Sequence, residues 1–400
     1  MSGLGSTIAN LSRMRRNLSH ALNAAELRPP RGAPAQPSRL RPLTGFGSNP
    51  GNLRMYEYVP QSVAPSPALV VVLHGCTQTA AAYDNGSGWS TLADQQGFVL
   101  LYPEQQAANN PKTCFNWFEP ADIRRGGGEA LSIRQMIERT IVEHDVDRSR
   151  VFITGLSAGG AMAGVMLAAY PEGFAGGAII AGLPYGTAAN VQDALASMFQ
   201  GRSKDARQWG DLVRAASPHR GPWPKISVWH GDADTTVKPT NAVEIVKQWS
   251  DVHGLSGTPA LETRGPGFVR QAWRTDAGED VVESFTLGGM AHGTPLAAGT
   301  GEGRYGVAGP FLLDVGVSST HRIGRFFGLV PEGGAVRAST PAWPPTGVIE
   351  FTTPSSETPT GQPEPRPESN GERSHKPGGL PIDVNAVITK ALKAAGLMRS

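Results

Sequence analysis

The sequence predicts an α/β fold with an open, mostly parallel, doubly wound sheet between residues 51 and 330. Two observations carry this prediction. Short apolar runs alternate along the segment with helical patterns, which is the order of a parallel sheet whose strands are joined by helices. Several runs, such as residues 69–73, are apolar without interruption, as strands covered on both faces require. A single domain of this class can reach this length, so we expect the segment to form one domain.

The apolar runs and helical periods place the individual elements. Strands are expected at residues 55–59, 69–73, 98–102, 151–154, 177–181, 226–230 and 281–287. Helices are expected between and after them, where apolar residues recur at steps of three and four, at residues 129–144, 158–169, 240–252 and 320–329.

The two ends of the chain differ from this body in composition. Residues 1–50 combine a basic amphipathic helix over residues 6–25 with a proline-rich linker. Residues 331–381 form a second linker, rich in Pro, Ser, Thr, Gly and Glu, that we expect to be disordered. Residues 382–400 predict a short amphipathic helix. Each terminal helix either docks on the body or a second protomer, or adsorbs to an apolar surface such as a polymer granule.

Composition and charge exclude several classes of protein. No stretch approaches the ~20 apolar residues of a membrane span. The excess of basic residues lies in the first 50 residues, which hold seven arginines and one acid, whereas residues 51–330 hold 22 basic and 26 acidic residues, so the body does not fit a nucleic-acid-binding domain. Two cysteines exclude a cysteine-rich zinc site. Arg13, Arg15 and Arg16 stand where a secretory signal would have its apolar core, and a cytoplasmic location is expected on that ground.

The strand at 151–154 leads into the sequence Gly-Leu-Ser-Ala-Gly at 155–159 and then into a helix. This is the G-x-S-x-G motif between a strand and a helix, where the turn holds a serine hydroxyl at the carboxyl edge of the sheet. The flanking glycines allow the strained backbone and the close approach of helix and strand. Ser157 is therefore the predicted nucleophile.

A serine nucleophile needs a base and a group that orients the base. His292 lies in a glycine-rich loop after the strand at 281–287 and is the predicted base. Asp232 and Asp234 both follow the strand at 226–230, so either could supply the acid. Asp234 is preferred because it lies further from the strand and can reach the next loop, while Asp232 could form the turn itself.

Two backbone N–H groups should bind the oxyanion that develops in acyl transfer. Ala158 follows the nucleophile, and Cys76 lies in the loop after the strand at 69–73. Cys114 lies in the loop after the next strand, so its thiol either forms a disulfide with Cys76 or both thiols are reduced and buried. Trp89, Trp117 and Phe118 are candidates for lining the substrate pocket, with a core position as the equal alternative.

Seven blocks of the body resemble one known family. They are LHGCTQ at 73–78, SGW at 87–89, YPEQ at 102–105, CFNWF at 114–118, GLSAGG at 155–160, HGDADTTV at 230–237 and GMAHGTP at 289–295. In this order they resemble the polyhydroxybutyrate depolymerase family of esterases, within the α/β-hydrolase fold. The resemblance implies that Ser157 is the nucleophile and His292 the base, and it favours Asp234 as the acid because the family pattern H-G-x-x-D-x-x-V uses its second aspartate.

The resemblance implies a serine carboxylesterase that forms an acyl-enzyme on esters of short 3-hydroxyalkanoic acids, either poly(3-hydroxybutyrate) or its oligomers. Such a mechanism needs no metal or organic cofactor. The alternative substrates are feruloyl or acetyl esters of plant polysaccharide, since esterases of those kinds share the core. A non-enzymatic alternative is a protein that binds polymer granules through its terminal helices. The polymer-degrading members are commonly secreted, which makes an extracellular location the alternative to the cytoplasm.

Overall fold

The computed structural model describes residues 38–299 and 301–331. Its strands are β1 (Arg41–Leu43), β2 (Arg54–Tyr58), β3 (Leu69–Leu73), β4 (Val99–Glu104), β5 (Val151–Leu156), β6 (Gly176–Ile180), β7 (Lys225–Gly231), β8 (Leu261–Gly265), β9 (Phe268–Arg274), β10 (Asp280–Leu287), β11 (Thr294–Leu296) and β12 (Leu312–Asp314). Its helices are α2 (Ala80–Ser87), α3 (Trp89–Gln96), α4 (Pro120–Ile123), α5 (Gly128–His144), α6 (Ala158–Ala169), α7 (Val191–Gln200), α8 (Ala206–Ala215), α9 (Thr240–Val252) and α10 (Ser319–Phe326), with short 3₁₀ turns at Arg148–Arg150 and Pro171–Gly173.

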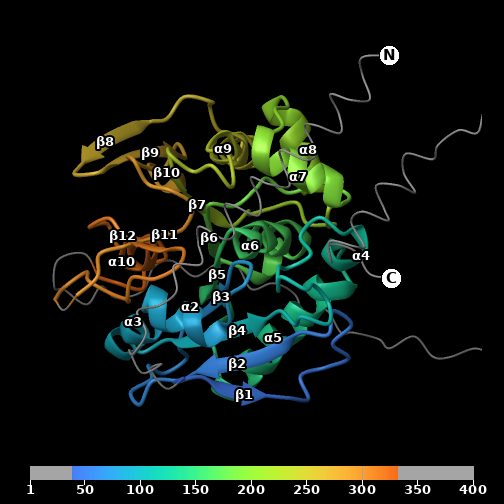
Figure 1. Ribbon diagram of the computed structural model, residues 1–400, viewed down its shortest axis with the longest axis vertical. Helices are drawn as coiled ribbons and strands as arrows, with labels where there is room; N and C mark the ends of the chain where they lie inside the picture. Colours follow the sequence, from blue (N-terminus) through green and yellow to red (C-terminus); the bar gives the residue numbers. More distant parts are fainter. Residues whose placement is uncertain (1–37, 300, 332–400) are drawn as a thin grey trace, which may run out of the picture. The chain divides into compact units, whose positions relative to one another are not determined.

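The main sheet has ten strands in the order β1-β2-β4-β3-β5-β6-β7-β10-β9-β8, from the lower to the upper end of Figure 1. The central strands from β4 to β10 run parallel to one another. Antiparallel strands flank them at both edges. The predicted open and mostly parallel sheet is therefore confirmed. A small parallel pair, β11 and β12, lies outside the main sheet.

Helices cover both faces of the sheet, because its central strands are apolar on both sides. Leu69, Val71 and Leu73 of β3 pack in a core cluster with residues of α5, α6 and α9. Val70 and Val72 face the other way and pack with residues of α2, α3 and α10. Alternate residues of one strand thus contribute to two separate cores, which is the doubly wound arrangement predicted from the uninterrupted apolar runs.

All seven predicted strands and all four predicted helices are present, with ends within three residues of those expected. Sequence reasoning missed the edge strands β1 and β8, the strand β9 next to β8, the β11–β12 pair, and helices α2, α3, α4, α7 and α8. The predicted end of the first linker, at residue 50, lies too far along the chain, because Arg41–Leu43 already forms strand β1 and pairs with β2. A three-residue edge strand has no apolar period, and Pro42 is tolerated there because an edge strand leaves N–H groups unpaired.

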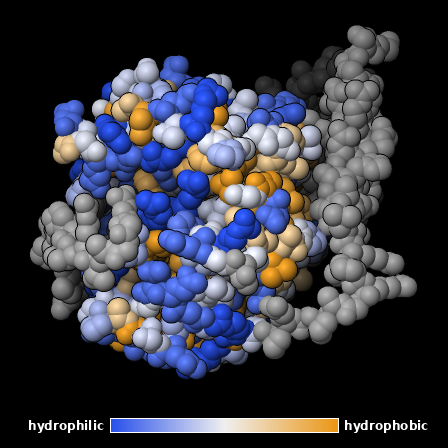
Figure 2. Space-filling model, turned by 90° about the vertical axis from the view of Figure 1, so that its left-hand side faces the viewer, coloured by the Kyte–Doolittle hydropathy of each residue, from blue (hydrophilic) through white to orange (hydrophobic). Residues whose placement is uncertain are grey.

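The predicted terminal helices and the second linker lie outside the described residues. Within the described residues, no helix combines the length and the apolar character needed to cross a bilayer. Figure 2 shows one face of the molecule on which hydrophilic residues dominate and hydrophobic residues gather toward the right-hand side.

Candidate active site

Ser157 occupies the turn between β5 and α6. Its φ of 57° and ψ of −117° lie in a region that residues with a side chain rarely adopt. The turn is held by a hydrogen bond of 2.8 Å from the Ser157 N–H to the carbonyl oxygen of Ile180. The serine is 9% exposed. A strained residue fixed in this way at a strand-to-helix turn matches the geometry expected of a G-x-S-x-G nucleophile.

Glycines beside Ser157 let α6 start directly against the sheet. A Cβ atom on Gly155 would lie 2.4 Å from the backbone of Gly159. A Cβ atom on Gly159 would lie 2.5 Å from the carbonyl oxygens of Leu73 and His74. The motif therefore needs glycine at both positions, because any side chain there would push the helix away from β3 and β5.

His292 and Asp234 meet at the same edge of the sheet as Ser157. They follow β10 and β7, whose carboxyl ends lie on the side where β5 ends. His292 Nδ1 lies 2.6 Å from Asp234 Oδ2. An ionised carboxylate only accepts hydrogen bonds, so Nδ1 carries the proton and Nε2 is left as the basic nitrogen.

Asp234 is buried, with 2% of its surface exposed, and its second oxygen is also satisfied. Oδ1 accepts the N–H groups of Thr236 and Val237 at 2.8 and 2.9 Å. Burial alone would raise the pKa of this carboxyl, but hydrogen bonds from His230 and His292 hold the pKa well below its usual range. Asp234 is therefore a permanently charged acceptor at neutral pH.

Asp232 has a different place in the same loop. It is exposed, and its Oδ1 accepts the N–H of Gly289 at 2.7 Å. This bond joins the loop after β7 to the loop that carries His292. The structure thus brings Asp234 to His292, while the Asp232 side chain bonds to the neighbouring loop and not to its own turn, as the alternative for it had expected.

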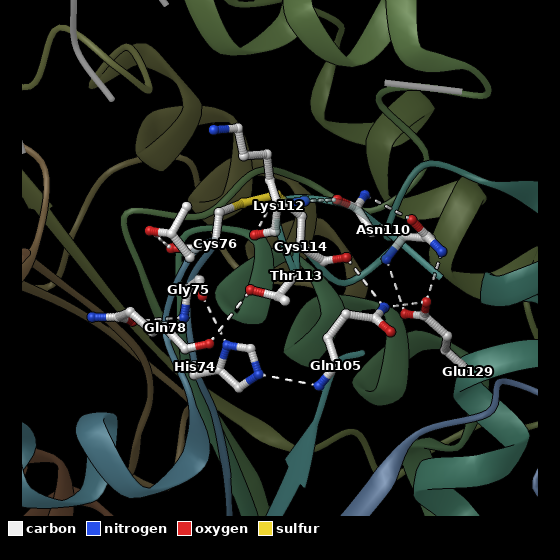
Figure 3. The surroundings of a disulfide bond; sticks show 12 residues. His74, Gly75, Cys76, Gln78, Gln105, Asn110, Lys112, Thr113, Cys114 and Glu129 are labelled. Atoms are coloured by element: carbon white, nitrogen blue, oxygen red, sulfur yellow. Dashed lines mark hydrogen bonds between the residues drawn. A yellow bond between two sulfur atoms is a disulfide. The ribbon is translucent and has the colours of Figure 1, made fainter. Parts of the chain in front are cut away.

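The two cysteines form a disulfide, as one of the two alternatives predicted. It connects the loop after β3 with the loop after β4 (Figure 3). The Thr77 N–H also donates to the Lys112 carbonyl oxygen at 2.7 Å, so the two loops are joined next to the disulfide as well. The Ala158 N–H is the first of helix α6 and has no partner within the helix. Cys76 and Ala158 follow β3 and β5, which are adjacent strands.

Comparison with known proteins identifies the family. Residues 54–271 match the family described as "Esterase PHB depolymerase". The chain belongs to this esterase family. The esterase is 49% identical over 292 residues to "Poly(3-hydroxyalkanoate) depolymerase C" of Paucimonas lemoignei, an alignment that covers 73% of this chain and 70% of the relative. It is 36% identical over 271 residues to "Acetylxylan esterase" of Coprinopsis cinerea, covering 66% of this chain and 71% of that one.

Among solved structures, the esterase resembles "Acetyl xylan esterase from Aspergillus awamori" with a TM-score of 0.63 and 27% identity. That match covers 73% of this chain and 99% of the other. The fold is thus the α/β-hydrolase fold, and the chain is a carboxylic ester hydrolase.

Two of the three aromatic residues for which a pocket lining and a core position were equal alternatives are buried in this esterase. Trp89 is 1% exposed and packs edge-on against Phe98 inside the core. Trp117 is 7% exposed and packs edge-on against Phe118, which is half-buried. The placement of Trp89 agrees with the core alternative. Phe118 is the most accessible of the three.

Two polar residues of the esterase were not expected at the site. His230 Nε2 lies 3.2 Å from Asp234 Oδ2 and 2.8 Å from the Val237 carbonyl oxygen, so it gives Asp234 a second imidazole neighbour beside His292. Sequence reasoning treated His230 as structural, although its place four residues before Asp234 was a signal. Glu129, at the start of α5, is fully buried close to the disulfide. A buried glutamate in a helix cannot be told from a surface glutamate by its spacing alone.

One group of metal-ligand type occurs in the described residues, away from the triad candidates. Glu57, Glu143 and His144 have ligand atoms within 4.8 Å of one another. Arg41 forms ion pairs with both glutamates and Arg139 pairs with Glu143, so both carboxylates already have arginine partners. This group has a structural explanation, as the link between the edge of the sheet and the end of α5.

Proposed function

We propose that this esterase hydrolyses the ester bonds of poly(3-hydroxybutyrate), or of oligomers of short 3-hydroxyalkanoic acids, through an acyl-enzyme on Ser157. The observation that supports this substrate is the 49% identity to a poly(3-hydroxyalkanoate) depolymerase over most of both chains. The observation that supports the mechanism is the hydrogen bond between His292 and Asp234 at the edge of the sheet where the G-x-S-x-G turn lies.

In the proposed reaction, Ser157 Oγ attacks the ester carbonyl carbon while His292 Nε2 takes the hydroxyl proton. The N–H groups of Cys76 and Ala158 bind the oxygen of the tetrahedral intermediate. The intermediate collapses when His292 gives its proton to the oxygen of the leaving alcohol. Water then attacks the acyl-enzyme by the same route, which releases the carboxylic acid and restores Ser157. Asp234 holds the imidazole in place and stabilises its protonated form.

The test is release of 3-hydroxybutyrate from amorphous poly(3-hydroxybutyrate) granules, measured beside hydrolysis of p-nitrophenyl butyrate. Wild type should act on both substrates, and Ser157→Ala should lose several orders of magnitude in kcat on each. If Ser157→Ala kept wild-type turnover, the mechanism would be wrong. If wild type hydrolysed only the small ester, the polymer would be the wrong substrate.

Acetyl or feruloyl esters of plant polysaccharide are the second candidate, because acetylxylan esterases are among the relatives. Acetate release from acetylated xylan, compared with 3-hydroxybutyrate release at equal enzyme concentration, separates the two candidates. A higher kcat/KM on acetylated xylan would favour this alternative.

Attachment to polymer granules by the terminal amphipathic segments is part of the proposal, supported by their sequence pattern. Deletion of residues 1–37 and 382–400 removes both segments and spares β1. The truncated enzyme should keep its turnover of p-nitrophenyl butyrate but sediment less with granules. Unchanged sedimentation would reject the attachment role.

The Cys76–Cys114 disulfide supports an oxidising compartment as the site of action, and so favours the extracellular alternative over the cytoplasm. Maleimide labelling of the protein in its native cells, before and after reduction, tests this. Labelling before reduction would favour the cytoplasm.

A further inference from the structure

Glu129 is a buried acidic residue that the proposed reaction does not use. Its Oε2 accepts the backbone N–H of Asn116 at 2.9 Å. Its Oε1 accepts the side-chain amides of Asn116 at 2.8 Å and Gln105 at 2.6 Å. A buried carboxyl group is costly unless hydrogen bonds replace its lost water. Three donors converge on this one, which indicates that the surrounding loop is organised around it.

The hydrogen bonds of Glu129 lead directly to the disulfide (Figure 3). The Gln105 Nε2 group that bonds to Glu129 also donates to the Cys114 carbonyl oxygen at 3.1 Å. The Gln105 backbone N–H donates to His74 Nε2 at 3.1 Å. Gln105 therefore contacts Cys114, which is bonded to Cys76, and also contacts His74, two residues before Cys76.

The loop of Cys76 is thus held from two sides. On one side, His74 Nδ1 lies 2.8 Å from the Gly75 carbonyl oxygen while its other nitrogen accepts from Gln105. On the other side, the disulfide links Cys76 covalently to the Cys114 loop, so the position of that loop constrains Cys76. A hydrogen-bond donor of an oxyanion site acts over a narrow range of distance. A small shift of this loop should therefore weaken binding of the transition state more than binding of the substrate.

We propose that Glu129 is a positioning residue for the oxyanion site: it fixes Gln105 and Asn116, which hold the Cys114 loop, and the disulfide transmits that position to the Cys76 N–H. Glu129 itself does not contact the substrate. The inference rests on the proposed role of Cys76 in binding the oxyanion.

The test compares Glu129→Gln with Glu138→Gln. Glu138 lies on the same helix and pairs with Arg134 and Arg148 at the surface. The amide introduced by Glu129→Gln keeps the shape of the side chain but cannot accept all three hydrogen bonds. For p-nitrophenyl butyrate we expect kcat to fall about 10- to 100-fold in Glu129→Gln, with KM within about twofold of wild type. Glu138→Gln should match wild type in both constants.

A boronic acid that forms a tetrahedral adduct with Ser157 gives a second readout. Its inhibition constant should rise in Glu129→Gln by about the same factor as kcat falls, because the adduct places an oxygen in the oxyanion site. A purely structural role would leave kcat per folded enzyme and the inhibition constant unchanged, and either result would overturn the inference.

Gln105→Met provides a variant that spares Glu129. It removes the side-chain donor to Glu129 and to Cys114, and it should also lower kcat at constant KM. If Glu129 acts through Gln105, the kcat of the double variant should be only slightly lower than that of the less active single variant. Additive losses would contradict the proposed route. If Ser157→Ala were active, the proposed function itself would fail; if it were inactive while Glu129→Gln kept wild-type kcat, only this inference would fail.

Discussion

Removal of the Cys76–Cys114 disulfide tests the stability and the activity of the site together. The two cysteines are 38 residues apart in the sequence, and the bond closes a loop that holds β4, α2 and α3. Closing a loop of that length lowers the entropy of the unfolded chain by an amount worth about 4 kcal/mol at 25 °C. A typical domain has a free energy of unfolding of only about 5–15 kcal/mol, so the expected loss is a large fraction of the total.

Activity should fall less steeply than stability. The Thr77 N–H bond to the Lys112 carbonyl oxygen and the contacts of Gln105 do not depend on the sulfur atoms. Loss of one whole oxyanion donor costs about 100- to 1,000-fold in kcat. A donor that is displaced but still present should cost less, so we expect about a 10-fold loss in kcat with little change in KM.

The assay uses a Cys76→Ala/Cys114→Ala double variant, which keeps the backbone N–H at position 76 and leaves no free thiol. Urea unfolding gives its stability and p-nitrophenyl butyrate hydrolysis gives its kcat, each beside oxidised and reduced wild type. Reduced wild type should behave like the variant. If the variant unfolded within about 1 kcal/mol of oxidised wild type, the loop-entropy argument would be refuted. If its kcat were unchanged, the disulfide would have no part in positioning the oxyanion site.

Three further predictions address the acid, the motif glycine and the buried glutamate. Asp234→Asn should lower kcat on p-nitrophenyl butyrate by roughly three to four orders of magnitude, and Asp232→Asn by less than about tenfold; the reverse order would reassign the acid. Gly159→Ala should lose about 1–3 kcal/mol in urea unfolding because its Cβ meets the Leu73 and His74 carbonyl oxygens, while Gly164→Ala, whose Cβ finds its nearest atom at 3.6 Å, should not lose stability. Burial, aided by the charge of Asp122, raises the pKa of Glu129 to about 8 from an ordinary value of 4.5. Folding therefore favours the protonated form of Glu129, and the stability that this contributes is lost as pH rises from the ordinary pKa through about 8. The free energy of unfolding of wild type, measured with urea, should therefore fall relative to that of Glu129→Gln between pH 5 and 9. Parallel plots of unfolding free energy against pH for the two proteins would contradict this.

The fold could be predicted where burial imposes a pattern. β3, β5 and β6 are buried along their whole length, so their apolar runs stand out in the sequence. β8 could not be found in this way, because nearly all of its residues are exposed and only the pairing with β9 makes it a strand. α2 has the sequence AAAYDNGS, which contains no apolar period. Its start is fixed instead by the Thr79 side chain, which accepts the N–H of Ala82.

The site could be predicted where its chemistry sits in a local motif. Ser157 stands in a five-residue pattern, and His292 and Asp234 follow strands that the sequence already places. Glu129 has no such context. Its donors, Asn116 and Gln105, lie 13 and 24 residues away, and only the folded chain brings them to one carboxyl group. Long-range polar contacts of this kind depend on the packing of α5 against the sheet, which no local pattern records.

Gly231 lets the loop after β10, which carries His292, turn toward the end of β5, where the proposed nucleophile lies. β10 is separated from β5 by β7 and β6, so the chain after β10 must turn back across the end of β7 for His292 to serve Ser157. It does so directly over Gly231: a Cβ atom there would lie 2.1 Å from the Met290 carbonyl oxygen. The Ala233 N–H donates to that same oxygen at 3.1 Å, and the Asp232 carboxylate accepts the N–H of Gly289. The glycine and the first aspartate of the HGDAD sequence therefore guide the loop that carries His292, and its second aspartate lies within hydrogen-bond distance of His292 itself.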